Sequence, residues 1–177
     1  YPAVVSVLVN DGKLLAIESH KEAAHADAEV NAIKEAFLKE NPKSVLSTLK
    51  SSQEIHNFLI ENHNSFFNDC EVFVTLEPCN HIGKTPSCAN LLKILKPKRV
   101  IISVKDPNKI ASGGIETLLN ENIDVTLGVL ENEGYNLLLP FMSWQNKTCI
   151  FFKMAQTLNG TIDGKISSNR ALAYVHT

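Results

Sequence analysis

Side chains of the types that bind zinc occur in two widely separated parts of this chain, and they constrain its fold more than any other feature. Asp27 and Glu29 open a segment whose apolar residues have helical spacing, while Cys79 follows a strand-like run and Cys88 begins another helical segment. Zinc takes Cys, His or Asp/Glu ligands in tetrahedral geometry, and a catalytic ion keeps one position for water. A chain that uses Asp27, Cys79 and Cys88 together must therefore bring a strand end and two helix starts to one point.

The position of these residues also suits catalysis. Helix N-termini favour anionic ligands and lower the pKa of thiols, which helps Cys79 and Cys88 to bind as thiolates. Glu29, two residues after Asp27, can take a proton from a metal-activated water and deliver one to a leaving amine. An acid/base carboxylate next to one ligand, followed by two cysteines, is the arrangement that a zinc nucleobase deaminase needs.

The first ligand has two candidates. Such sites normally begin His-x-Glu, whereas this chain has Asp27 at that position and His25 two residues upstream. His25 lies four residues before Glu29, a spacing that places side chains on one face of a helix. Two other interpretations stay open: a closed structural zinc site with His81 as fourth ligand, or incidental cysteines with Asp27 as a simple helix N-cap.

Composition argues against several other classes of protein. The 177 residues suffice for one well-packed domain and the edge of a second, and hydrophobic and charged shares of 44% and 20% are ordinary for a globular protein. A net charge of −2 provides no basic surface for nucleic acid. No apolar run reaches the roughly 20 residues of a membrane span, and no secretory pattern is present. The four cysteines are too few for a disulfide scaffold, so we expect reduced thiols and a cytoplasmic location.

Strand-like and helical segments alternate along the chain. Strands are expected at residues 3–9, 14–18, 71–76, 99–104 and 125–127. Helices are expected at residues 27–39, from residue 51 onward, and at 88–96, 115–122 and 130–141. Asp11-Gly12 predicts a tight hairpin between the first two strands, because such turns require positive φ. The alternation predicts an α/β fold, namely a three-layer α/β/α sandwich with a mixed sheet.

Three smaller expectations concern residues outside the zinc cluster. His56 in the second helix is expected at the surface, because it has no partner ligand at a useful spacing. Gly113-Gly114 precedes a helix and could hold a phosphate, but a lone Gly pair is weak evidence for that, and we expect a turn. The polar stretch 143–148 is predicted to be a linker between domains.

Four sequence blocks resemble the deaminase domain of the bifunctional riboflavin-biosynthesis deaminase–reductase family, in the cytidine deaminase-like superfamily. These blocks are PAVVSVLV…GKLLAIESH, DAEVNAIKEA, VTLEPCNHIGKTPSCA and DPNKIASGGIETLLNENIDVTLGV. The third block is the most specific, because it keeps both the family's cysteine spacing and the Gly-Lys-Thr-Pro between the cysteines. The resemblance covers residues 2–141, apart from an apparent insertion around residues 41–69.

The resemblance implies a cytidine deaminase-like fold and the hydrolytic removal of the 2-amino group of 2,5-diamino-6-ribosylamino-4(3H)-pyrimidinone 5′-phosphate. It implies that residues 1–145 form the deaminase domain, without the family's N-terminal helix, and that residues 146–177 are a linker and the first strand of a truncated reductase domain. NADPH would then serve only that reductase domain, most of which is missing here. The protein is expected to act on a small phosphorylated pyrimidine, to bind neither nucleic acid nor membrane, and to form a homo-oligomer.

The resemblance also assigns roles to single residues. Asp27 falls on the family's zinc-binding histidine and Glu29 on its proton shuttle. Cys79 and Cys88 fall on its cysteine ligands. The positions that line the family's substrate pocket correspond to His20, His81, Lys84, Thr85 and Asn108. Lys84 is chemically suited to a phosphate, because its ammonium group acts there as a point charge.

Asp27 is the main departure from the family pattern. One carboxylate and two thiolates on Zn²⁺ sum to −1, whereas a neutral histidine and two thiolates sum to zero. We therefore predict a weaker Lewis acid and a higher pKa for the bound water than in a histidine site. The alternatives are a cytidine or tRNA-adenosine deaminase, whose sites are typically Pro-Cys-x-x-Cys, and a catalytically decayed zinc module, which would have no use for Glu29.

Overall fold

The computed structural model describes residues 3–19, 27–81, 83 and 85–146. The chain divides into two units, residues 1–147 and 148–177, and the described residues all belong to the first. Two predicted substrate residues, His20 and Lys84, lie outside the described residues, as does the alternative ligand His25. The predicted first strand of the reductase domain lies outside them as well.

Five strands form one sheet in this part of the chain: β1 (Val5–Asn10), β2 (Lys13–Ser19), β3 (Cys70–Leu76), β4 (Arg99–Val104) and β5 (Asp124–Leu127). Their order is β2-β1-β3-β4-β5, with β1 antiparallel to both neighbours and β3, β4 and β5 parallel to one another. The predicted mixed sheet is thereby confirmed. The helices are α1 (Ala28–Glu40), α2 (Ser52–Asn62), α3 (Cys88–Leu95), α4 (Gly114–Asn120) and α5 (Glu131–Asn146), with a short 3₁₀ helix at Val45–Thr48.

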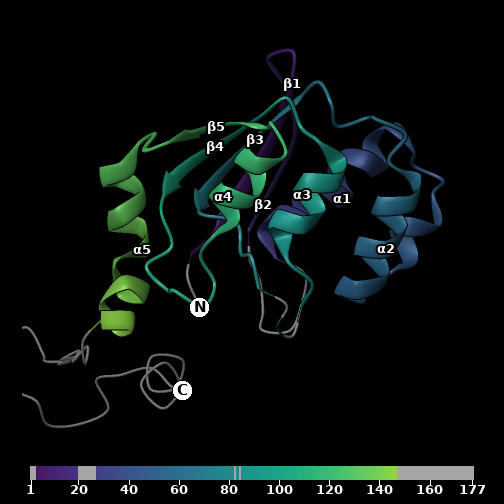
Figure 1. Ribbon diagram of the computed structural model, residues 1–177. Coiled ribbons are helices and arrows are strands. Elements are labelled where there is room, and N and C mark those ends of the chain that lie inside the picture. The colour runs from purple at the N-terminus through teal and green to yellow at the C-terminus, as the bar shows by residue number, and fades with distance from the viewer. Residues whose placement is uncertain (1–2, 20–26, 82, 84, 147–177) are drawn as a thin grey trace, which may run out of the picture. The chain divides into compact units, whose positions relative to one another are not determined.

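The first hairpin follows directly from its turn residues. Asp11 has a φ of 47° and Gly12 a φ of 72°, the pair of positive values that a two-residue type I′ turn requires. Asn10 and Lys13 pair across this turn, as predicted. β1 then pairs with β3 on its other side, so it lies inside the sheet (Figure 1).

Helices cover both faces of the sheet. Val100 of β4 is buried in the main core with Leu92 of α3 and Leu118 of α4, and α1 packs on β1 and β2. Successive side chains of a strand point to opposite faces, and Ser103 of β4 faces α5. Gly134 of α5 lies so close that a Cβ there would overlap the Ser103 hydroxyl. The predicted three-layer α/β/α sandwich is confirmed, with α5 on the face opposite α3 and α4 (Figure 1).

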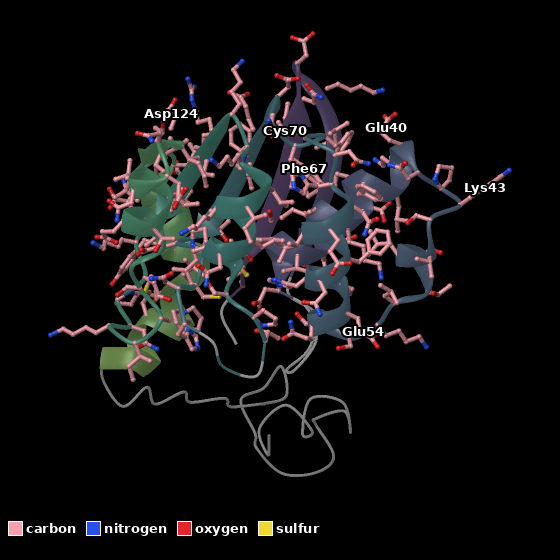
Figure 2. The ribbon with its side chains drawn as sticks, turned by 45° about the vertical axis from the view of Figure 1, so that its right-hand side comes forward. Glu40, Lys43, Glu54, Phe67, Cys70 and Asp124 are labelled. Atoms are coloured by element: carbon pink, nitrogen blue, oxygen red, sulfur yellow. The ribbon has the colours of Figure 1, made fainter. Side chains whose placement is uncertain are left out.

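The stretch predicted as an insertion, residues 41–69, adds α2 beside α1 and α3. Phe58 of α2 meets Phe37 of α1 edge to face, with ring centroids 5.9 Å apart. Phe67, at the end of the stretch, is 1% exposed, whereas Lys43 near its start extends away from the protein (Figure 2). The inserted segment is thus joined to the main core through aromatic packing.

His56 is buried, with 2% of its surface exposed, so its predicted surface position is wrong. Its neighbours Ile55 and Leu59 on α2 are buried too. The sequence places His56 beside the apolar stripe of this helix, and the face that packs on α1 and α3 is wide enough to include it. Burial lowers the pKa of the His56 imidazole, against a smaller opposite effect of the Asp27 charge.

α5 is longer than the helix predicted at residues 130–141. It continues through Pro140, so the stretch 143–148, predicted as a linker, is helical up to residue 146. Leu138 and Met142, on either side of the proline, are 0% and 4% exposed and pack at the ends of β3 and β4. Among the described residues, the structure shows no helix with the length and apolar character needed to cross a membrane.

Candidate metal centre

The three predicted zinc ligands lie together in the structure. Asp27 Oδ2 is 3.3 Å from Cys88 Sγ and 4.0 Å from Cys79 Sγ, and the ligand atoms of all three residues lie within 4.8 Å of one another. In a tetrahedral site with Zn–O of about 2.0 Å and Zn–S of about 2.3 Å, oxygen and sulfur ligands are about 3.5 Å apart. The donor set therefore fits a zinc ion and leaves one position for water.

Asp27 directs its side chain away from its own helix. It is the N-cap residue of α1, with φ −64° and ψ 164°, but its side chain makes no capping hydrogen bond. Its carboxylate faces the two cysteines and accepts a hydrogen bond of 3.2 Å from the Thr85 hydroxyl. The interpretation of Asp27 as a simple helix cap is therefore wrong. Thr85, predicted as a substrate residue, contacts the ligand carboxylate in this structure.

The start of α3 fixes the two cysteines. Ser87 caps this helix by accepting a hydrogen bond from the Asn90 amide, and its hydroxyl donates to the Cys79 carbonyl at 2.9 Å. The Ala89 amide donates to the same carbonyl at 3.1 Å. The Cys88 amide donates to Cys79 Sγ at 3.4 Å. The N–H groups at a helix start have no partner within the helix, and they favour an anionic acceptor such as a thiolate. The first turn of α3 thus orients both sulfurs.

Negative charge accumulates at this centre. The pKa lowering that the helix start predicts for the Cys88 thiol is wrong. Cys88 is 1% exposed, and the hydrogen bond with Cys79, burial and the nearby charges of Glu29 and Asp27 raise the pKa of its thiol well above the usual value. Two thiolates and a carboxylate at this distance repel one another unless a cation lies between them. Because metal binding must displace thiol protons, we expect zinc affinity to rise with pH.

Glu29 lies in the first turn of α1 beside the cluster and is 4% exposed. Burial, and to a lesser extent the charge of Asp27, raise the pKa of its carboxyl to about 7. A cation at the cluster acts in the opposite direction, since positive charge favours the carboxylate. A buried carboxyl beside the ligand cluster can accept a proton from a water molecule and return it within one reaction cycle.

His81 lies apart from the ligand cluster. It is exposed, and it is not among the described residues whose ligand atoms lie within 4.8 Å of one another. Within the part of the chain that the structure describes, the closed zinc site with His81 as a fourth ligand is therefore not formed. Among the residues that the structure describes, the arrangement is that of an open site with three protein ligands.

Asn108 lies on the loop that joins β4 to α4. Its side-chain oxygen accepts a hydrogen bond from the Ile110 amide at 3.0 Å, which fixes the local turn. The Asn80 amide donates to the Ala111 carbonyl at 2.8 Å. This hydrogen bond joins the loop of Asn108 to the residue that follows Cys79. The predicted substrate residue Asn108 and the predicted ligand Cys79 therefore lie on loops that are hydrogen-bonded to each other.

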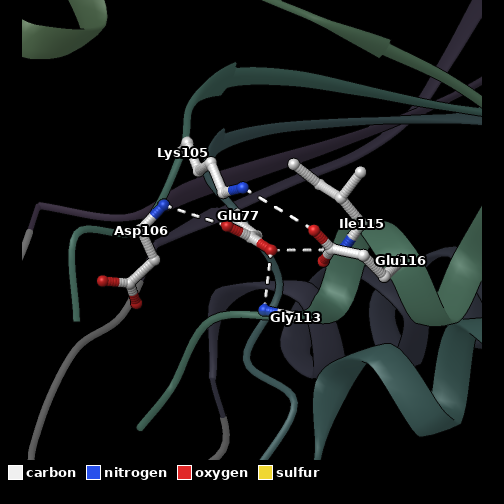
Figure 3. A network of polar contacts seen from close by, with 6 residues as sticks. All are labelled: Glu77, Lys105, Asp106, Gly113, Ile115 and Glu116. Carbon is white, nitrogen blue, oxygen red and sulfur yellow. Dashed lines mark hydrogen bonds and ion pairs between the residues drawn. The ribbon is translucent and has the colours of Figure 1, made fainter. Parts of the chain in front are cut away.

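Glu77 was given no role by sequence reasoning, although it also joins these loops. Its buried carboxylate accepts hydrogen bonds from the backbone amides of Asp106, Gly113 and Ile115 (Figure 3). Gly113, with a φ of 103°, is the N-cap of α4, so the predicted turn at this position is confirmed and its amide faces Glu77. Backbone amides leave no sequence pattern, so nothing in the sequence marks these partners.

Gly114 packs directly against the cysteine loop, and a Cβ there would overlap the Pro78 carbonyl oxygen. We expect Gly114→Ala to push α4 away from this loop and to lower the free energy of unfolding by about 2–3 kcal/mol. Gly12→Ala is the matched control, because a Cβ at Gly12 has no atom within 4 Å and only its φ of 72° resists the change, at about 1–2 kcal/mol. Urea unfolding measures both losses. A smaller loss for Gly114→Ala than for Gly12→Ala would contradict this packing.

Comparison with known proteins agrees with the geometry. Residues 1–104 match the family described as the cytidine and deoxycytidylate deaminase zinc-binding region. This match contains Asp27, Glu29, Cys79 and Cys88, and it covers more than half of the 177 residues. The donor set found in the structure lies within the matched region and fits the zinc site that the family description names.

The chain is also similar to several individual proteins. It is 34% identical over 164 residues to riboflavin biosynthesis protein RibD of Aquifex aeolicus, and these residues make up 91% of the chain and 38% of that protein. It is 35% identical over 141 residues to riboflavin biosynthesis protein PYRD, chloroplastic, of Arabidopsis thaliana, covering 76% and 27%. A Thermotoga maritima diaminohydroxyphosphoribosylaminopyrimidine deaminase/5-amino-6-(5-phosphoribosylamino)uracil reductase structure superposes with a TM-score of 0.69 at 30% identity, covering 99% and 45%. The chain spans less than half the length of each of these relatives.

Proposed function

Because the chain belongs to the cytidine and deoxycytidylate deaminase family, we propose that it catalyses the zinc-dependent hydrolytic deamination of a phosphorylated pyrimidine in riboflavin biosynthesis. The proposed substrate is 2,5-diamino-6-ribosylamino-4(3H)-pyrimidinone 5′-phosphate, whose 2-amino group is replaced by oxygen. The observation that carries the proposal is the buried Glu29 carboxyl beside Asp27, Cys79 and Cys88. The names of the similar proteins, RibD and deaminase/reductase, support this choice of substrate.

The proposed reaction uses Glu29 to move two protons. Asp27, Cys79 and Cys88 would hold the zinc ion, which would act as a Lewis acid and lower the pKa of a water molecule to near neutral pH. Glu29 takes a proton from this water as its oxygen bonds to C2, and passes the proton to the adjacent ring nitrogen. Glu29 then moves the remaining hydroxyl proton to the 2-amino nitrogen. The C–N bond breaks, ammonia leaves, C2 becomes a carbonyl, and Glu29 ends as it began, as a carboxylate.

Neighbouring residues hold these groups in place. The Thr85 hydroxyl donates to Asp27 and so keeps the carboxylate turned toward the cysteines. We place His81 and Asn108 at the substrate, together with His20 and Lys84 on the strength of the family resemblance. The Lys84 ammonium suits the 5′-phosphate because it acts as a point charge.

The wider setting of the domain is also a proposal. Since a similar protein is named a deaminase/reductase and the chain spans only 45% of it, we propose that the whole protein also carries an NADPH-dependent reductase. Thiols stay reduced in the cytosol, and Cys79 and Cys88 are free, so we propose the cytoplasm, or a plastid as in the chloroplastic relative. We propose a homo-oligomer, which sedimentation of the zinc-loaded protein would test directly.

Release of ammonia from candidate substrates tests the proposed function. We expect the zinc-loaded chain to deaminate the diaminopyrimidinone phosphate, to lose this activity when a chelator removes zinc, and to regain it when zinc is restored. Cytidine and deoxycytidylate should be poor substrates. Deamination of either one in place of the diaminopyrimidinone would support the cytidine deaminase alternative. A zinc-loaded chain that releases ammonia from none of them would be a decayed zinc module.

The charge of Asp27 predicts a pH effect. Activity requires a deprotonated water, and the predicted extra negative charge of the ligand set raises the pH at which that water ionises. Asp27→His removes this charge, so we expect the pH of half-maximal rate to move to a lower value. The measurement is the rate of ammonia release against pH, with zinc content determined for each sample. A pH profile that Asp27→His leaves unchanged, with zinc retained, would contradict the charge argument.

A further inference from the structure

We propose that Glu77 is a positioning residue of the deaminase site. Its carboxylate holds the loop of residues 105–115, which carries Asn108, in a fixed place relative to the metal ligand Cys79. This inference rests on the proposed function in one respect, because Asn108 is taken to contact the substrate. The fixed loop itself follows from the geometry alone.

The carboxylate of Glu77 bonds to both ends of the loop. Its side chain is 2% exposed, and its Oε2 accepts a hydrogen bond of 3.1 Å from the Asp106 amide. Its Oε1 accepts hydrogen bonds from the amides of Gly113 at 3.0 Å and Ile115 at 3.2 Å. In Figure 3 the three amides converge on the two carboxylate oxygens. One side chain thus closes the loop at its start and at its end.

Backbone bonds tie the same loop to the residues around Cys79. The Glu77 amide donates to the Val104 carbonyl at 2.9 Å, and the Asn80 amide donates to Ala111 at 2.8 Å. Gly114 also packs on the Pro78 carbonyl with no space for a Cβ. Since these contacts come from residues on both sides of Cys79, a shift of the loop relative to the ligand would break several of them together.

The three amides require that both oxygens of the Glu77 side chain act as hydrogen-bond acceptors. Gly113 has no side chain with which to cap α4, and Glu77 accepts the amide bonds that a cap would otherwise accept. Hydrogen bonds from amides to a buried carboxylate are stronger than those to a neutral acceptor. Glutamine has the same shape but offers one oxygen and one NH₂ group, so at least one of the three amides would face a donor.

Steady-state kinetics of Glu77→Gln test the role. We expect zinc content to stay at the wild-type level, KM to rise by about tenfold or more, and kcat to fall by less, because substrate contacts are displaced while the metal ligands and Glu29 stay in place. Glu116→Gln is the matched control: Glu116 is 60% exposed, lies next to the same loop, and pairs with Lys105 at 3.6 Å (Figure 3). Its KM and kcat should stay within about twofold of wild type.

Kinetic constants of Glu77→Gln equal to those of wild type, with zinc retained, would overturn the proposal. Loss of zinc with an unchanged KM would overturn it as well, since Glu77 would then support the metal and not the loop. If Glu77→Gln does not fold, hydrogen exchange in the wild-type chain decides. Protected amides at Asp106, Gly113 and Ile115, beside fast exchange at exposed Lys109, support the proposal, and equally fast exchange at all four overturns it.

A separate failure of the proposed function can be recognised. A wild-type chain that binds zinc but does not deaminate the pyrimidine contradicts the proposed function. The exchange rates at Asp106, Gly113 and Ile115 would still show whether Glu77 fixes the loop, because that measurement requires no substrate.

Discussion

Glu29→Gln is expected to reduce the rate of ammonia release by about 10²–10⁴-fold while zinc content stays at the wild-type level. Glutamine fills the same buried space, so the fold and the ligand residues are retained. It cannot take a proton from water or pass one to the leaving amine. The measurement is kcat for the diaminopyrimidinone phosphate, with zinc determined by mass spectrometry on the same samples.

The matched control for this change lies on the same helix. Glu35 of α1 is exposed, so Glu35→Gln removes the same charge from α1 without touching the site, and its kcat should equal that of wild type. If Glu29→Gln keeps zinc and stays within about tenfold of the wild-type rate, Glu29 is not the proton shuttle.

Asp27→Ala is expected to lower zinc affinity by more than about 100-fold, whereas His25→Ala should leave it near the wild-type value. Asp27 contributes one of three protein ligands, and its oxygen lies 3.3 Å from Cys88 Sγ. Without it two thiols remain, which form an incomplete site for zinc. Competition with a chromophoric chelator at fixed pH measures the affinity of each variant.

The pair of variants separates the two candidates for the first ligand. Thr85→Val is a third variant for this experiment, because it removes the hydroxyl that donates to Asp27 and leaves the Asp27 carboxylate in place. Its affinity should fall by about tenfold, less than that of Asp27→Ala. Loss of zinc in His25→Ala together with its retention in Asp27→Ala would assign the ligand to His25 and overturn the choice of Asp27.

The metal cluster was predictable because each part of it is marked locally in the sequence. Asp27 precedes an apolar helical repeat, and Cys88 begins one, so both could be placed at helix starts before their distance was known. Asp11 and Gly12 set the hairpin in the same way, since the φ values of a two-residue turn depend on those residues alone. Local signals of this kind correctly predicted the strands, the mixed sheet and the proximity of Asp27, Cys79 and Cys88.

Features that depend on long-range packing escaped prediction. α5 continues past Pro140 because Leu138 and Met142 are buried on the sheet ends, which outweighs the local tendency of proline to end a helix. His56 is buried because α2 packs on α1 and α3. Glu77 bonds to amides that lie 29 to 38 residues further along the chain, and backbone groups carry no residue type by which to find them.

All of the proposed chemistry depends on one zinc ion held by Asp27, Cys79 and Cys88. X-ray absorption at the zinc edge of the zinc-loaded chain measures this most directly, because it reports the number and kind of ligand atoms. We predict two sulfur ligands at about 2.3 Å and oxygen ligands at about 2.0 Å, without the multiple scattering that an imidazole ring produces. A spectrum with imidazole scattering, or with fewer than two sulfurs, would contradict the carboxylate–dithiolate site.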